Sequence, residues 1–415
     1  GAQTGKVVSK GLFGSDPGKF SASLESNSIA YIRDNGLGVT GPEDKFGSNN
    51  YLKMDYSRGH LSAGLQVEGY MPALYGFEIG QQADAKKFLL AAKYIRWTSE
   101  YFTFHVGDIY DQMGNGLIFR TYEDRNLGFN NSLEGFQAAV NIKDWFGIRG
   151  MYGRPRLYTS YAGSWVRGAT ATVSFNDIFG WDGILFNIEG NFLNRYESLD
   201  KDELHDFHAL GLDNANLNSY SAAFSWNGLS LKAEYAAKGK DLYSETATGA
   251  HIGAAIYAEA IYGIGGFSAS AHFRILDHMG TMSSLYGKGT GNSLSYLPAL
   301  TRQYHYMLAN LNPYQVNGRG ECAVQLDLFY TLRSGSDRNK YWIFRANASS
   351  AFTIDRMQSD NGERRLLWMD LNADAECHWN RQLRTTFLYS RQEWSPSHGY
   401  EEGTYASNIF VADAQ

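Results

Sequence analysis

The feature of this sequence that most constrains its fold is a two-residue alternation of apolar and polar side chains that recurs along the whole chain. Residues 229–235 read Leu-Ser-Leu-Lys-Ala-Glu-Tyr, and residues 61–68, 102–107, 267–274 and 367–374 alternate in the same way. Successive side chains of a β-strand point to opposite faces, so each run predicts a strand with one apolar and one polar face. Both a membrane barrel and a soluble β-sandwich are built from such strands.

The connections between the runs distinguish these two folds, because short and long links take turns along the chain. The short links are residues 57–60, 98–101, 143–145, 176–182, 225–228, 263–266, 334–339 and 379–382. The long links are residues 34–49, 72–87, 110–132, 154–163, 194–217, 238–250, 277–319 and 355–363. Short periplasmic turns that alternate with longer outside loops are typical of outer-membrane barrels. The sequence therefore predicts an all-β, transmembrane, antiparallel up-and-down β-barrel of about 18 strands or slightly more.

Composition favours the same fold. Aromatic residues make up 15% of the 415 residues, and no stretch approaches the roughly 20 consecutive apolar residues of a membrane helix. Six of the nine tryptophans lie at or beside the short links, namely Trp97, Trp145, Trp181, Trp226, Trp342 and Trp379. That placement is typical of an aromatic girdle at the periplasmic interface. The net charge of -6 excludes the basic surface of a nucleic-acid-binding protein.

One domain accounts for almost the whole chain. We expect residues 1–19 to form a periplasmic N-terminal segment and residues 20–415 to form a single barrel. The chain opens Gly-Ala-Gln, without a charged or apolar leader, which predicts a mature protein whose signal peptide has been removed. Its expected location is the outer membrane of a Gram-negative bacterium, in contact with lipid and lipopolysaccharide.

The polar faces of the predicted strands carry charges of both signs. Mixed signs favour a mutually neutralising network over a selective ion path, because selectivity usually needs a ring of one sign. The best acidic group is the candidate lumen cluster Asp370, Asp374 and Glu376, on one face of one strand.

Two long links are the candidate functional loops. The first, residues 114–135, contains Arg120, Glu123, Asp124 and Arg125 between apolar residues, and it either folds inward as a constriction or stands up as a docking surface. The second, residues 277–319, contains the tyrosines Tyr286, Tyr296, Tyr304, Tyr306 and Tyr314. Tyrosine-rich loops are favoured at protein interfaces, and a self-packed cap over the barrel mouth is the alternative. Residues 297–310 are predicted as a short helix.

Catalysis and metal binding find little support. Asp202, His205, Asp206 and His208 have a spacing that suits a divalent metal, but their acidic surroundings favour a solvated loop. Residues 277–278, Asp-His, have no serine or acidic pair that can be placed with them. We therefore expect no catalytic residues, no metal and no cofactor.

Several segments resemble an uncharacterised family of Bacteroidota outer-membrane proteins, known only as a domain of unknown function. They are residues 20–28, 42–46, 48–52, 106–110, 116–120, 122–125, 131–135, 152–156, 164–168 and 191–195. The resemblance is dense in the first half of the chain and thin in the second. It implies a barrel, an outer-membrane address and a Bacteroidota source, and it suggests an accessory barrel of the β-barrel assembly machinery.

The leading functional hypothesis is a non-enzymatic subunit of an outer-membrane protein complex, whose outside loops bind barrel assembly components or surface lipoproteins. The alternative is a porin or solute channel, because barrels of 16–18 strands leave an aqueous lumen.

Two further predictions test the strand assignment. Cys322 and Cys377 lie at opposite ends of strands two apart, so both should be free thiols. The residues expected to face lipid are Val67, Phe104, Ile142, Ile188, Leu231, Phe273, Leu328 and Leu371. Their sequence neighbours should face the lumen, since a shift of one residue would invert each strand.

Overall fold

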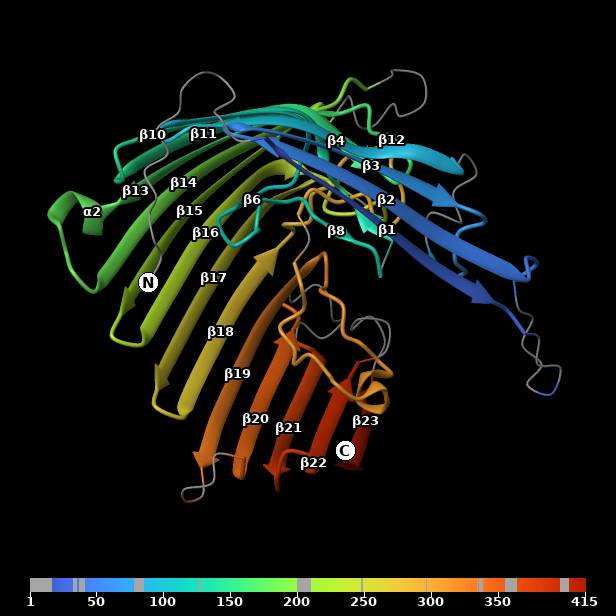
Figure 1. Cartoon of the computed structure of the whole chain (residues 1–415), viewed down its shortest axis with the longest axis vertical. Helices are drawn as coiled ribbons and strands as arrows, with labels where there is room; N and C mark the ends of the chain where they lie inside the picture. The colour runs from blue at the N-terminus through green and yellow to red at the C-terminus, as the bar shows by residue number, and fades with distance from the viewer. Residues whose placement is uncertain are drawn as a thin grey trace.

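The computed structural model describes residues 17–32, 36, 42–77, 86–126, 128–199, 210–247, 249–295, 297–333, 335, 339–354, 364–395 and 403–415. Within these ranges the chain forms one large antiparallel sheet that curls around the two longest inner loops (Figure 1). Each long strand pairs with the next long strand in the sequence. The all-β, antiparallel prediction is confirmed at this level.

The sheet contains eighteen long strands, which agrees with the predicted number. The first nine are β1 (Lys19–Ala30), β2 (Phe46–Arg58), β3 (Leu61–Tyr70), β4 (Phe88–Thr98), β5 (Phe102–Ile109), β10 (Leu133–Ile142), β11 (Phe146–Leu157), β13 (Trp165–Ser174) and β14 (Ile184–Tyr196). The last nine are β15 (Asn214–Trp226), β16 (Leu229–Asp241), β17 (His251–Ile264), β18 (Phe267–Asp277), β19 (Gly320–Arg333), β20 (Tyr341–Phe352), β21 (Leu366–His378), β22 (Arg384–Trp394) and β23 (Tyr405–Ala414).

The remaining elements are short. They are β6 (Gln112–Met113), β7 (Phe119–Arg120), β8 (Glu123–Asp124), β9 (Phe129–Asn130), β12 (Ser160–Tyr161), the helix α2 (Phe175–Phe179) and the 3-10 helix η1 (Met307–Asn310). The helix predicted for residues 297–310 is wrong, because its described residues are irregular up to η1. No helix in the described ranges is long and apolar enough to cross a membrane.

Tight turns join the strands at the end of the sheet where the short links lie. Between β15 and β16 the turn consists of Asn227 and Gly228, with φ angles of 44° and 82°. Two residues with positive φ form the hairpin turn whose twist matches that of the strands, and Asn-Gly is its preferred sequence. A side chain at position 228 would also lie 2.4 Å from the carbonyl oxygen of Gly263. Glycine is therefore required at this corner.

Burial along the strands is the reverse of that in a soluble protein. Seven of the eight residues predicted to face lipid are exposed on the convex side, and Val67 is half-buried. Their polar counterparts are covered: Glu68, His105 and Asp370 expose 1%, 2% and 0% of their surface. The predicted strand registers are therefore confirmed, with an apolar outer face and a polar inner face.

The two cysteines are free thiols, as predicted. Cys322 pairs across the sheet with Phe352 near one end of β20, whereas Cys377 pairs with Trp342 near its other end.

The two end strands of the sheet each have one neighbour in the described part of the chain. β1 pairs with β2, and β23 pairs with β22. The curl of the sheet brings both end strands to the same side of the molecule, on the right in Figure 1.

Candidate functional site

The first inner loop, residues 110–132 between β5 and β10, folds into the concave side of the sheet. Its residues Met113, Leu117, Ile118 and Phe119 are almost completely buried and pack in one apolar cluster with side chains of β11, β13, β14 and β15. Burial of this apolar segment removes it from water, which stabilises the inward conformation. Of the two conformations considered for this loop, the structure shows the inward one.

Wall carboxylates hold the tip of the first inner loop. The backbone N–H of Gly114 donates to Glu189 of β14 at 2.8 Å. The backbone N–H and the side-chain amide of Asn115 donate to Glu234 of β16, at 2.5 and 2.8 Å. A Cβ atom on Gly114, whose φ is +54°, would lie 2.4 Å from a Glu234 oxygen. A glycine is therefore needed where the loop approaches the wall.

Asp111 attaches the same loop to the nearer wall. It accepts a hydrogen bond from Gln137 at 2.6 Å and lies 3.1 Å from the guanidinium of Arg149. Burial raises the pKa of Asp111, and Arg149 opposes that shift.

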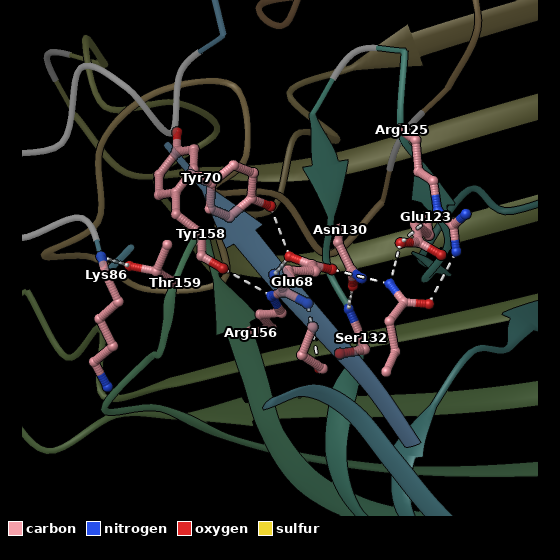
Figure 2. A network of polar contacts seen from close by, with 12 residues as sticks. Glu68, Tyr70, Lys86, Glu123, Arg125, Asn130, Ser132, Arg156, Tyr158 and Thr159 are labelled. Atoms are coloured by element: carbon pink, nitrogen blue, oxygen red, sulfur yellow. Dashed lines mark hydrogen bonds and ion pairs between the residues drawn. The ribbon is translucent and has the colours of Figure 1, made fainter. Parts of the chain in front are cut away.

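The far end of the loop binds strands at the edge of the sheet through Arg125, which Figure 2 shows beside Glu123. Arg125 forms ion pairs with Glu25 of β1 at 2.6 Å and with Glu123 at 3.3 Å. Its guanidinium also lies over the ring of Tyr51, 4.7 Å from the centroid. Of the other charged residues predicted for this loop, Arg120 lies over the ring of Tyr122, and Asp124 pairs with Phe129 in a two-strand hairpin.

A buried ion pair lies beside this network. Arg156 of β11 donates to Glu68 of β3 at 2.8 Å, and it also donates to the carbonyl oxygens of Tyr158 and Ala91. Tyr70 donates to the same Glu68 oxygen at 2.6 Å. Figure 2 shows Glu68 between Tyr70 and Arg156. Glu68 was expected to face the lumen as a sequence neighbour of Val67, but Arg156 was missed, because no local pattern relates positions that are 88 residues apart.

The second inner loop, residues 278–319 between β18 and β19, packs against the opposite wall. Tyr306 donates to Asp413 of β23 at 3.0 Å, and Tyr314 donates to Glu321 of β19 at 2.5 Å. Tyr304 donates to Asp370 of β21. Burial raises the pKa of Tyr304, and the Asp370 carboxylate adds to that shift. These three tyrosines belong to a self-packed cap.

The other two tyrosines of the predicted interface lie elsewhere. Tyr286 is exposed, and Tyr296 lies outside the described residues.

Two of the three carboxylates in the candidate lumen cluster are paired with arginines. Asp370, Asp374 and Glu376 lie on the inner face of β21, as predicted. Arg302 from the second inner loop and Arg345 from β20 both bind Asp374, and Arg345 also binds Glu376 at 3.0 Å. The cluster therefore holds the loop to the wall and presents little net negative charge.

Between the two inner loops lies a cavity of about 940 Å³. Its lining comes from strands β2, β3, β11 and β18, from both inner loops and from residues 243–246, and it includes Tyr51, Glu68, Arg125, Arg156 and Asn317. The sequence signalled Arg125 but not Asn317, which carries no motif. This cavity is the candidate functional site.

The suggested metal group belongs to a link that the structure describes only in part. Asp202, His205, Asp206 and His208 lie outside the described residues. Among the residues that the structure describes, no group of three or more His, Cys, Asp or Glu side chains is arranged to hold a metal ion. Asp277 and His278 do form a hydrogen-bonded pair, and the ring of His278 stacks on that of His251 with centroids 4.3 Å apart.

Comparisons with known proteins connect the chain to one sequence family and to several solved structures. Residues 8–415 match a family of unknown function (DUF6029). No curated protein matches the chain in sequence.

Similar solved structures include two proteins of Pseudomonas aeruginosa, OccK8 (OprE) and OccK5 (OpdH). OccK8 has a TM-score of 0.48 and 11% identity, with 96% of this chain and 98% of that chain covered. OccK5 has a TM-score of 0.48 and 10% identity, with 96% and 97% covered. The outer membrane protein opdK of the same organism has a TM-score of 0.43 and 10% identity, with 95% and 97% covered.

The leading expectation, a structural or accessory subunit of an outer-membrane protein complex, is wrong. That expectation relied on a tyrosine-rich loop being available to partners, whereas Tyr304, Tyr306 and Tyr314 bind carboxylates of their own chain. Binding of envelope proteins by the outside loops stays a prediction that no comparison tests.

Proposed function

We propose a function for this chain, which belongs to the family of unknown function DUF6029: it is an outer-membrane porin through which small polar solutes diffuse. The family assigns no activity, so the proposal is argued from the chain's own geometry.

The observation that carries the proposal is the cavity of about 940 Å³. It lies within a sheet whose outer face is apolar and whose inner face is polar. The outer face of the sheet exposes apolar side chains such as Leu231, Phe273 and Leu371, which suit lipid. The inner face carries paired charges, including Lys232–Glu259 and Arg345–Asp374. A sheet of this size encloses an aqueous lumen when it closes. The inner loops then narrow the lumen, and the cavity between them is the entrance for solutes.

Closure of the sheet into a barrel belongs to the proposal. Eighteen long strands is an even number, so β1 and β23 run antiparallel if they meet. Each end strand has apolar outward side chains, Phe20 and Leu24 on β1 and Phe410 on β23. Unpaired N–H and C=O groups are costly in lipid, so an open edge cannot lie there. Pairing of β1 with β23 satisfies both edges.

The proposed location is the outer membrane, with the inner loops at the outside end and the tight turns in the periplasm. Residues 1–19 are then a periplasmic segment, and lipid and lipopolysaccharide surround the wall. Trp226 beside its turn and Trp379 near another are both exposed, which suits an interfacial girdle.

Single-channel recording in a planar lipid bilayer tests the proposal. The purified full chain, shown to be folded by its faster migration before boiling, is expected to give steady single-channel currents in potassium chloride. Polyethylene glycols of increasing mass should lower the current until they become too large to enter. A folded chain that inserts and carries no current would overturn the porin proposal.

A further inference from the structure

Charged groups line the cavity between the inner loops, but each already forms hydrogen bonds or ion pairs within the chain. Among the described lining residues the cations are Arg125 and Arg156. Arg156 is satisfied by Glu68 and two carbonyl oxygens. Arg125 is satisfied by Glu25, Glu123 and Gln66. An anionic solute would therefore meet no uncommitted cation. Taking Arg156 would leave the buried Glu68 carboxylate unpaired, and taking Arg125 would break its ion pairs with Glu25 and Glu123.

The carboxylates of the lining are engaged as well. Glu68 accepts from Arg156, Tyr70 and Gln66. Asp124 accepts from the backbone of Asn126, and Glu245 accepts from the backbone of Gly289. With four carboxylates and two arginines the lining is weakly acidic, which further disfavours anions.

The rest of the lining is aromatic and uncharged polar. Its half-buried aromatic rings are Tyr122 and Phe129 from the first inner loop and Tyr314 from the second, whereas Tyr51 and Tyr70 from the strands are almost completely buried. An aromatic face carries partial negative charge and packs well against the weakly positive C–H groups on the face of a sugar ring. Binding sites for small molecules typically combine such surfaces with a few directed polar groups.

One polar group of the lining has a donor to offer. Asn317 lies in the second inner loop with only 7% of its surface exposed. Its side-chain oxygen accepts from Arg319, but its Nδ2 finds no hydrogen-bond partner in the described part of the chain. A buried amide without a partner is unfavourable. Asn317 lines the cavity, so a rotation of its side chain would bring this donor to a hydroxyl or ether oxygen there.

We infer that the cavity between the inner loops binds an uncharged saccharide, with aromatic rings against the sugar faces and Asn317 donating to a sugar oxygen. The inference rests on the proposed porin function and names its solute class. It differs from the porin proposal in requiring saturable binding, which diffusion through an aqueous lumen does not require.

Saturation-transfer NMR on the full chain in detergent tests binding without requiring a current. The probes are maltotriose, which is uncharged, and maltobionate, a sugar acid. Maltotriose should give a saturable signal, and maltobionate should bind at least tenfold more weakly. The inference is overturned if maltotriose gives no saturable signal or if maltobionate binds as tightly.

Paired variants locate the site. Asn317→Leu keeps the approximate shape but removes the donor, and it should weaken maltotriose binding at least fivefold. The matched control is Asn312→Leu, in the same loop, exposed and outside the cavity lining. Phe129→Leu should weaken binding to a similar extent, whereas Phe129→Tyr should retain it. Equal binding by Asn317→Leu and Asn312→Leu would overturn the assignment.

The two proposals fail separately. A normal bilayer current without saturable maltotriose binding overturns the saccharide site and leaves the porin proposal standing. Saturable maltotriose binding without a bilayer current overturns the porin proposal and leaves the saccharide site standing.

Discussion

Single residues on the inner wall show how a chain can bury charge and remain stable. Arg156 and Glu68 both have side chains that are 2% exposed, and their contact is 2.8 Å. Additional hydrogen bonds from Tyr70 to the carboxylate and from the guanidinium to two carbonyls satisfy the remaining groups. Loss of one member would leave the other as an uncompensated buried charge, which is strongly destabilising.

The substitution Arg156→Met tests this pair. It should lower the free energy of unfolding by about 3–5 kcal/mol, measured by urea titration of the folded protein in lipid. The double variant Glu68→Gln/Arg156→Met should recover most of that loss, because no buried charge then remains. The control Lys53→Met breaks an exposed pair with Asp55 and should change the free energy by less than about 1 kcal/mol. A loss for Arg156→Met as small as that of the control would contradict the role of the pair.

The cysteines allow a second test at this scale. Cys322 and Cys377 are free and lie toward opposite ends of their strands. Maleimide labelling of the unfolded chain without reductant should therefore modify both thiols. Labelling that requires prior reduction would contradict the strand order.

The two inner loops lie on the concave side of the sheet and bind its inner face. The first inner loop is held at its tip by hydrogen bonds to Glu189 and Glu234. Hydrogen bonds to a charged acceptor contribute about 1.5–3 kcal/mol each. The loop is therefore held mainly by wall carboxylates at its tip and by its apolar segment.

Removal of those acceptors should release the tip. In the double variant Glu189→Ala/Glu234→Ala, single-channel current should rise by about half or more and become noisier, because the loop no longer narrows the lumen. Glu189→Gln/Glu234→Gln retains acceptor oxygens and should behave more like the unchanged chain. The control Glu259→Ala removes a wall carboxylate that pairs with Lys232. Currents that are the same in all three variants would show that the tip does not restrict the path.

At the scale of the whole molecule, the sheet has a seam between its two end strands. β1 and β23 each pair on one side only in the described residues. Their inner faces are identified by contacts with the inner loops, because Glu25 binds Arg125 and Asp413 accepts from Tyr306. Ser23 lies on the same face as Glu25, and Ser407, Ile409 and Val411 lie on the same face as Asp413.

Disulfide trapping tests closure of the seam. In a chain with Cys322→Ser and Cys377→Ser, the variant Ser23→Cys is combined in turn with cysteine at Ser407, Ile409, Val411 and Asp413. A closed barrel should give an intramolecular disulfide in high yield for one pair, because facing residues bring their Cβ atoms within about 3.5–4.5 Å. Cross-linked dimers alone, or no cross-link at any position, would contradict closure within one chain.

Local physics made much of the fold predictable from the sequence. Alternation with a period of two assigns each side chain to a face, and the eight short links fixed where strands reverse. Leu231, Phe273 and Leu371 are exposed on the outer face as predicted. The free cysteines followed from the same assignment. The predicted helix at residues 297–310 failed except for the 3-10 turn η1, because Leu297 and Leu300 pack against the wall instead of along a helix.

The candidate site was much less predictable. Residues 116–119, Gly-Leu-Ile-Phe, have the same sequence whether the loop folds inward or stands outward. Tyr304 and Tyr314 look like interface residues in sequence, and their partners Asp370 and Glu321 lie far along the chain or on another element. Asn317 belongs to no sequence pattern that would mark it as a site residue.

The sequence by itself determined the strands, their faces and the order in which they pair, because these depend on periodicity and on the length of each link. Only the tertiary structure decided which way the long loops turn, which charges neutralise one another and where the cavity lies. Those features depend on contacts such as Arg156–Glu68, between residues 88 positions apart. The free energy of such a contact comes from burial and from a complete set of partners, which exist only once the wall has curled around the loops.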